Sequence, residues 1–134
     1  MKVRIKKYDG KTNTFPTSVK IDKHDLWSLD ITLAQIIYPA LKKLKKVKHG
    51  APNVDLSDVL DQSLHPTEDE IIRYEYDGKT DENYFKRWDY VIDQMIWSFK
   101  IIKKGDLHFL TDDDFNRMQN GLRLFSKYYL SLYD

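Results

Sequence analysis

The sequence contains no cysteine, and this absence excludes disulfide bonds, thiolate zinc sites and cysteine nucleophiles. Glycine is also scarce, with five residues in the chain, and none of them belongs to a glycine-rich phosphate-binding loop. No segment approaches the run of roughly 18 apolar residues that a membrane-spanning helix needs. The formal net charge is +1, so no overall excess of positive charge attracts nucleic acid. These absences predict a soluble protein without membrane contact. Nucleic acid stays a possible but less favoured partner.

The length of 134 residues is typical of one domain with a hydrophobic core. Hydrophobic residues (41%) and charged residues (32%) occur in proportions that are ordinary for a soluble globular chain. We expect a single domain over residues 1–134, with a β-hairpin at 1–22 and a helical bundle at 25–134. The hairpin is predicted because Val3 and Ile5 alternate with basic residues, and apolar residues alternate again at Val19 and Ile21.

Three later segments repeat apolar residues at intervals of three and four, which predicts amphipathic helices packed into a shared core. The first begins near Asp25 or Ser28 and runs to Lys46, and we expect Pro39 to kink it. Its apolar positions are Leu26, Leu29, Leu33, Ile36, Ile37, Leu41 and Leu44.

The second long helix is predicted from Tyr84 to Lys104, and the third begins after Thr111, a favourable N-cap. The apolar positions of the third are Phe115, Met118, Leu122, Phe125, Tyr129 and Leu132. Thr67 and Glu70 match a capping box that opens a short helix. The alternating apolar and polar residues over 72–76 favour a strand instead. Both structures therefore stay possible for residues 67–80. The predicted fold is mainly α (α+β), with a three-long-helix bundle, an N-terminal β-hairpin and short connecting helices.

Several sequence blocks, spread over most of the chain after residue 19, share one resemblance. They are Trp27-Ser28-Leu29-Asp30, Ile37-Tyr38-Pro39, Lys48-His49-Gly50-Ala51-Pro52, Asp81-Glu82-Asn83-Tyr84-Phe85-Lys86-Arg87-Trp88-Asp89, Asp93-Gln94-Met95-Ile96-Trp97 and Asn120-Gly121-Leu122-Arg123-Leu124-Phe125. Together they resemble a family of uncharacterised small proteins from tailed phages, especially T4-like phages of marine bacteria. The resemblance implies a phage gene product made in the cytoplasm of a host bacterium, and it implies no particular activity. The chain departs from the family at Tyr84, where a histidine is common.

Carboxylates offer one enzymatic alternative. Asp89 and Asp93 are four residues apart and share a helix face, and Asp30 starts another helix that is expected to pack nearby. Three converging carboxylates would bind Mg or Mn through hard oxygen ligands. This set would suit a metal-dependent enzyme acting on nucleotides or phosphoesters. Solvated helix faces explain the same spacing more simply, so our main prediction has no catalytic residue and no cofactor.

The remaining distinctive residues predict a binding surface. It comprises Lys45, Lys48, His49, Gly50, Pro52, Arg87, Trp88 and Trp97. Trp88 and Trp97 are nine residues apart and therefore lie on opposite sides of a helix, so at least one is expected to face away from the core and to anchor a partner. We therefore predict a phage-encoded, non-enzymatic accessory protein that binds and modulates a host or phage macromolecule. We expect this partner to be a protein. A minor virion component is a further alternative.

Overall fold

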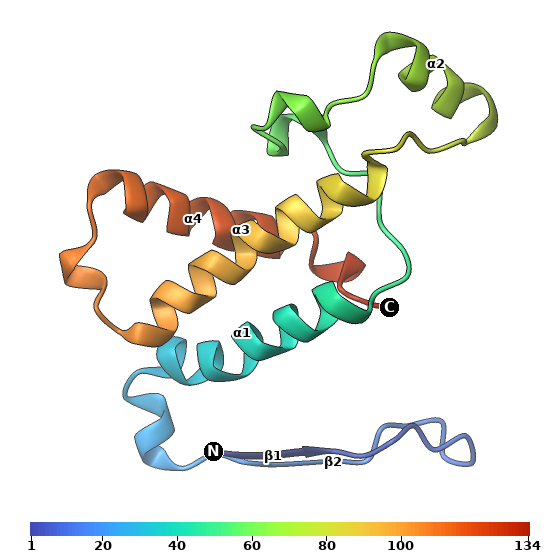
Figure 1. Ribbon diagram of the computed structural model, residues 1–134. Helices are drawn as coiled ribbons and strands as arrows, with labels where there is room; N and C mark the ends of the chain where they lie inside the picture. Colours follow the sequence, from blue (N-terminus) through green and yellow to red (C-terminus); the bar gives the residue numbers. More distant parts are fainter.

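The computed structural model describes all 134 residues and has a mainly α-helical fold with one N-terminal β-hairpin (Figure 1). The strands are β1 (Lys2–Ile5) and β2 (Thr17–Lys20), and the α-helices are α1 (Leu29–Val47), α2 (Glu68–Asp77), α3 (Tyr84–Lys104) and α4 (Asp112–Lys127). Short 3-10 helices connect them: η1 (Lys23–Leu26), η2 (Leu56–Asp58), η3 (Gln62–Leu64), η4 (Leu107–Phe109) and η5 (Tyr129–Ser131). The predicted three-long-helix bundle with a hairpin and short connecting helices is confirmed.

Helix α3 is the central element of the bundle, because it packs against both α1 and α4 (Figure 1). Its apolar stripe is fully buried at Trp88, Val91, Ile92 and Met95. The helix ends at Gly105, whose φ of 79° is the left-handed conformation that glycine adopts at little cost. The periodicity of this segment therefore predicted both its bounds and its buried face correctly.

Helix α4 begins as predicted but ends early. The Thr111 side chain accepts a hydrogen bond from the Asp114 amide at 3.2 Å, which caps the first turn. The helix stops at Lys127, so the predicted stripe does not continue as helix to Leu132. Its most buried positions are Met118, Gly121 and Leu124, whereas Phe115 and Tyr129 are exposed.

Gly121 explains this shift of the buried face. A Cβ atom at this position would lie 1.8 Å from the Ser98 Oγ and 2.5 Å from the Gln94 carbonyl oxygen. Ser98 is itself fully buried, and its hydroxyl donates to the carbonyl of Met118 at 2.9 Å. The backbones of α3 and α4 thus approach too closely for any side chain at Gly121.

The segment 67–80 contains a helix, α2 (Glu68–Asp77), and no strand. The Thr67 hydroxyl accepts from the Glu70 amide at 3.2 Å, and the Glu70 carboxylate accepts from the Thr67 amide at 3.0 Å. This reciprocal capping box satisfies two amides that the first turn of α2 would otherwise leave free. The alternation over 72–76 is therefore not a strand signal here, and α2 lies at the end of the molecule away from the hairpin (Figure 1).

Helix α1 runs through Pro39 to Val47, but only part of its predicted stripe is buried. Leu41 is in the core, whereas Leu29, Leu33 and Ile36 are 40%, 42% and 43% exposed. The prediction that the whole stripe faces inward is wrong, because α3 covers one side of α1 and no helix covers the other. The hairpin runs beside that open side (Figure 1).

The hairpin makes little contact with the helical bundle. Its strands pair antiparallel, with Val3 opposite Val19 and Lys2 opposite Lys20, and every residue of both strands is exposed. The ammonium group of Met1 forms an ion pair with Asp25 of η1 at 2.9 Å, and this contact lowers the pKa of the Asp25 carboxyl. None of the helices combines the length and the apolar composition that crossing a lipid bilayer requires.

Candidate functional site

The basic end of α1, predicted as part of a binding surface, is held by carboxylates of the same chain. Lys45 pairs with Asp93 at 2.8 Å, and the mostly buried Lys48 ammonium pairs with Asp89. Both carboxylates belong to α3, so the two ion pairs fasten the end of α1 to the central helix. These lysines are already neutralised within the chain and present little free charge to a partner.

His49 is also paired, with the C-terminal residue of the chain. Its Nδ1 lies 2.7 Å from a carboxylate oxygen of Asp134, and the contact lowers the pKa of that carboxyl. Gly50 and Pro52 follow in the chain and line a small hollow of about 150 Å³ together with Tyr133. This part of the predicted surface is accessible, but the His49 ring is already held by the Asp134 carboxylate.

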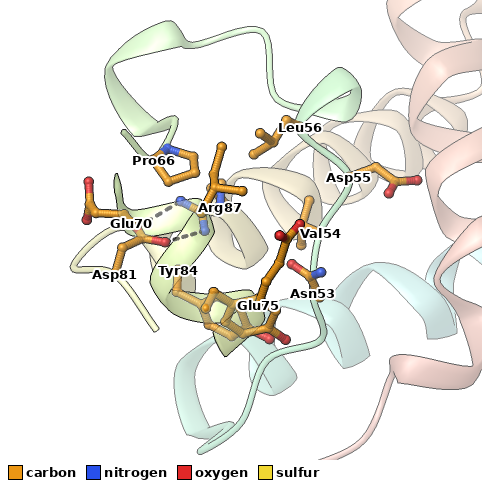
Figure 2. A pocket seen from close by; sticks show the side chains of 12 residues that line it. Asn53, Val54, Asp55, Leu56, Pro66, Glu70, Glu75, Asp81, Tyr84 and Arg87 are labelled. Carbon is orange, nitrogen blue, oxygen red and sulfur yellow. Dashed lines mark hydrogen bonds and ion pairs between the residues drawn. The ribbon is translucent and has the colours of Figure 1, made fainter. Parts of the chain in front are cut away.

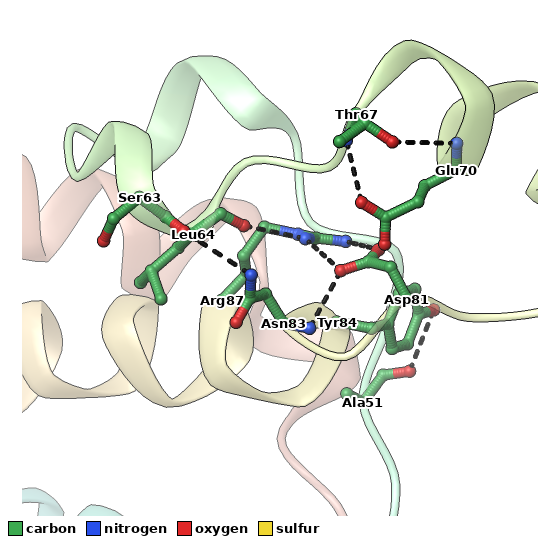
Figure 3. Close-up of polar contacts among 9 residues, drawn as sticks. All are labelled: Ala51, Ser63, Leu64, Thr67, Glu70, Asp81, Asn83, Tyr84 and Arg87. Atoms are coloured by element: carbon green, nitrogen blue, oxygen red, sulfur yellow. Dashed lines mark hydrogen bonds and ion pairs between the residues drawn. The ribbon is translucent and has the colours of Figure 1, made fainter.

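Arg87 and Trp88 do not lie on any surface. Arg87 is 3% exposed and Trp88 is 1% exposed, so the prediction that they contact a partner directly is wrong. The Arg87 guanidinium donates to both carboxylate oxygens of Asp81, at 2.9 and 2.7 Å, and to the Leu64 carbonyl at 2.9 Å (Figure 3). Arg87 thus ties α3 to the connecting segments on either side of α2.

Trp97 is half-buried and is covered by another residue of the chain. The Arg117 guanidinium of α4 lies 4.1 Å from the centre of the Trp97 ring, a cation–π contact between α3 and α4. The expectation that one of Trp88 and Trp97 faces away from the core is met only in part, because Trp97 is half-buried, packs against the core and is covered by Arg117.

A pocket of about 260 Å³ lies between α2, the first turn of α3 and residues 53–56 (Figure 2). Its walls include the Arg87–Asp81 ion pair, and the hydrogen bonds from Arg87 lower the pKa of the Asp81 carboxyl. Burial, with a contribution from the neighbouring Tyr74, raises the pKa of the Tyr84 hydroxyl to about 12. Arg87 directs three of its five N–H donors at Asp81 and Leu64, and the raised pKa keeps the Tyr84 hydroxyl protonated at neutral pH.

The carboxylates of the metal-site alternative do not gather into one site. Asp89 and Asp93 are engaged with lysines, as described above, and no group of three or more His, Asp or Glu side chains is arranged to hold a metal ion. Asp30 occupies the first turn of α1, where a negative charge meets the positive end of the helix. This arrangement gives Asp30, Asp89 and Asp93 structural roles.

A further cluster of charged groups fixes η2 against α4. Arg123 and Lys127 donate to the buried Asp58 carboxylate at 2.7 and 2.6 Å, and the Tyr128 hydroxyl donates to it at 2.7 Å. Burial acts to raise the pKa of Asp58, but these three hydrogen bonds outweigh it and lower that pKa. Like Lys45 and Lys48, Arg123 and Lys127 of α4 are therefore paired with carboxylates of the same chain.

The hairpin segment differs from the rest of the molecule in charge. We call residues 1–23 the N-terminal unit: they contain seven basic and two acidic residues, a formal charge of +5, whereas residues 24–134 contain fifteen basic and nineteen acidic residues, a formal charge of −4. The basic residues of this unit are Lys2, Arg4, Lys6, Lys7, Lys11, Lys20 and Lys23. None of these side chains forms an ion pair. The net charge of the chain is therefore near zero because a positive region and a negative region nearly cancel each other.

The neighbourhood of the N-terminal unit also exposes apolar side chains. Trp27, which directly follows η1, is 74% exposed and lies tilted against the His24 ring, with ring centres 4.5 Å apart. A groove of about 530 Å³ separates the hairpin from α1 and is lined partly by Val3, Ile31 and Ile36. Trp27, and not Trp88 or Trp97, is the exposed tryptophan of this protein.

Sequence reasoning missed the N-terminal unit because it weighed the net charge over the whole chain. The excess of basic residues in 1–23 was the signal that could have found it. Comparisons of the chain with models of protein families, with curated proteins and with solved structures found no match. The resemblance to a phage family stays a prediction.

Proposed function

We propose that this chain is a non-enzymatic accessory protein that binds an acidic macromolecule through its N-terminal unit. One observation carries the proposal: residues 1–23 hold seven basic side chains against two acidic ones, and none of the seven forms an ion pair. In the bundle, by contrast, acidic residues outnumber basic ones, and Lys45, Lys48, Arg123 and Lys127 are paired with carboxylates. Exposed, unpaired positive charge attracts an acidic partner over distances of about 10 Å and speeds its association.

The build of the hairpin supports the same proposal. An isolated two-stranded hairpin is marginally stable in water, and this one has four-residue strands that bury no side chain. A partner that covers the hairpin would add the contacts that the bundle does not supply. If the resemblance to phage proteins holds, the partner is a host or phage macromolecule met in the bacterial cytoplasm.

Site-specific photo-crosslinking tests this proposal. A photoreactive residue at Val19, in the N-terminal unit, is compared with one at Phe109, an apolar residue of the bundle that is even more exposed (87% against 55%). In extract of phage-infected bacteria, we expect one discrete crosslinked product from position 19 only. The product should disappear when Lys2, Arg4 and Lys20 are changed to glutamate. Equal crosslinking from both positions, or a product that survives the charge reversal, would contradict the proposal.

Neither of the other functions has an arrangement of residues that favours it. The metal-dependent enzyme needs carboxylates that here are bound to lysines. The minor virion component would appear as a fixed number of copies in purified particles, and quantitative mass spectrometry of such particles tests that alternative separately.

A further inference from the structure

We propose that the basic face of the hairpin binds the phosphate backbone of double-helical nucleic acid. This inference rests on the proposed function, because it names the chemistry of the acidic partner. It concerns one face of the hairpin, whose residues are set by the register of the two strands.

The register places the cations together. Lys2 lies opposite Lys20, and Arg4 lies opposite Ser18. Directly opposed residues of an antiparallel pair point to the same face, and alternate residues along a strand do so too. The Lys6 amide donates to the Pro16 carbonyl at 3.0 Å, which extends the same register by one pair and adds Lys6 to this face.

The opposite face of the hairpin is apolar. It carries Val3 opposite Val19 and Ile5 opposite Thr17. We call the face with Lys2, Arg4, Lys6, Ser18 and Lys20 the basic face; it contains no acidic residue. Its four cations are free of intramolecular ion pairs, so they repel one another until an external anion neutralises them.

The spacing of these cations suits a regular row of phosphates. Alternate residues of an antiparallel strand are about 6.8 Å apart, and each DNA strand carries one charge per about 3.4 Å of helix axis. Lys2, Arg4 and Lys6 therefore repeat at about twice the axial spacing of the phosphates. A two-stranded ribbon also fits the major groove of B-form DNA, which is about 12 Å wide.

The side chains of the strands favour a duplex over a single strand. Proteins that bind single-stranded nucleic acid without sequence preference stack the bases on aromatic side chains. Neither face of β1 and β2 has an aromatic residue, and the nearest rings, Tyr8 and Phe15, pack against each other with centres 5.2 Å apart. The basic face instead offers ammonium, guanidinium and hydroxyl donors, which suit phosphate oxygens.

Fluorescence anisotropy of the full-length chain with a labelled duplex tests this inference. Four phosphate contacts predict a slope of about −3.6 for the logarithm of the affinity against the logarithm of the salt concentration. The affinity should therefore fall about 150-fold between about 50 mM and about 200 mM salt. The K2Q/R4Q/K20Q variant should bind weakly, with a slope near −0.9, because one cation of the basic face remains.

A matched control removes the same charge elsewhere. Lys79, Lys86 and Lys100 are exposed, form no ion pair and lie in the bundle region, so K79Q/K86Q/K100Q should keep the slope of the wild-type protein. Circular dichroism melting of both variants checks that the helical fold is intact. Equal loss of binding in the two variants would overturn the inference, because the basic face would then have no special part.

Two further arms separate this inference from the proposed function. Binding to a single strand as tight as to the duplex would overturn the choice of double-helical nucleic acid. Binding to poly-glutamate through the same residues, without binding to the duplex, would overturn the inference while the proposed function stands. If the chain bound neither the duplex nor poly-glutamate, and no crosslink formed from Val19, both the inference and the proposed function would be overturned.

Discussion

The buried Arg87–Asp81 pair gives the sharpest test of how this molecule is held together. The two side chains are 4% and 7% exposed, and two hydrogen bonds join them. Asp81→Asn removes the negative charge with almost no change in volume and leaves a buried guanidinium facing an amide. Breaking a buried ion pair by removing one partner costs about 3 to 5 kcal/mol of unfolding free energy. That is a large share of the total of about 5 to 15 kcal/mol for a domain.

Urea denaturation followed by circular dichroism measures this loss. The control is Asp93→Asn, which breaks the exposed Lys45–Asp93 pair, whose side chains are 37% and 49% exposed. An exposed pair contributes about 0 to 1 kcal/mol, so the control should unfold at nearly the wild-type urea concentration. A comparable small loss in both variants would refute the reasoning, because Arg87 would then have to be solvated and available to a ligand.

The same pair also predicts a dependence on pH. Hydrogen bonds from Arg87 lower the pKa of Asp81 in the folded protein. The pair therefore stabilises the fold fully above the pKa of about 3.9 of an unfolded aspartate. That stabilisation is lost as the pH falls through the lowered pKa of the folded state. The difference in unfolding free energy between wild type and Asp81→Asn should shrink in acid below about pH 4 and stay constant near neutrality.

Two other positions give independent predictions. Gly121→Ala should lower the unfolding free energy by about 1 to 3 kcal/mol or more, measured by urea denaturation, because the added Cβ meets the Gln94 carbonyl oxygen of the facing backbone; a neutral result would mean that α3 and α4 are not in close contact. Trp27→Phe should remove most of the fluorescence that acrylamide quenches while changing stability by less than about 0.5 kcal/mol, because Trp27 is the exposed tryptophan. Unchanged quenching in that variant would contradict its exposure.

The sequence predicted a long helix best where packed helices cover its whole apolar stripe. In α3 the apolar residues recur at three and four, and the stripe lies between α1 and α4. The capping residues Thr67 and Thr111 were equally informative, because a cap depends only on residues within the same turn. The predicted apolar face of α4 differs from the face that is buried, because the periodicity of apolar residues does not show that Gly121 must face Ser98.

The candidate site was predicted less well, and for a different reason. Lysines, arginines and tryptophans were assigned to a surface by residue type, yet Arg87 and Trp88 are in the interior and Lys48 is nearly so. A buried arginine needs an acidic residue that lies close in space, which here is Asp81. The separation of the two residues in the sequence does not predict that they pair. The unit at 1–23 was overlooked because its positive charge is cancelled by acidic residues far along the chain.

The sequence alone determined the elements of this protein: the hairpin, the long helices, their caps and the excess of basic over acidic residues in the first 23 positions. These properties depend on residues that are close together in the sequence, so they can be recognised without the tertiary structure. Only the tertiary structure decided which side of α1 is covered, which cations are neutralised and which tryptophan is free. Burial and ion pairing require a second group brought close from a distant part of the chain, and α1 offers more apolar surface than α3 covers.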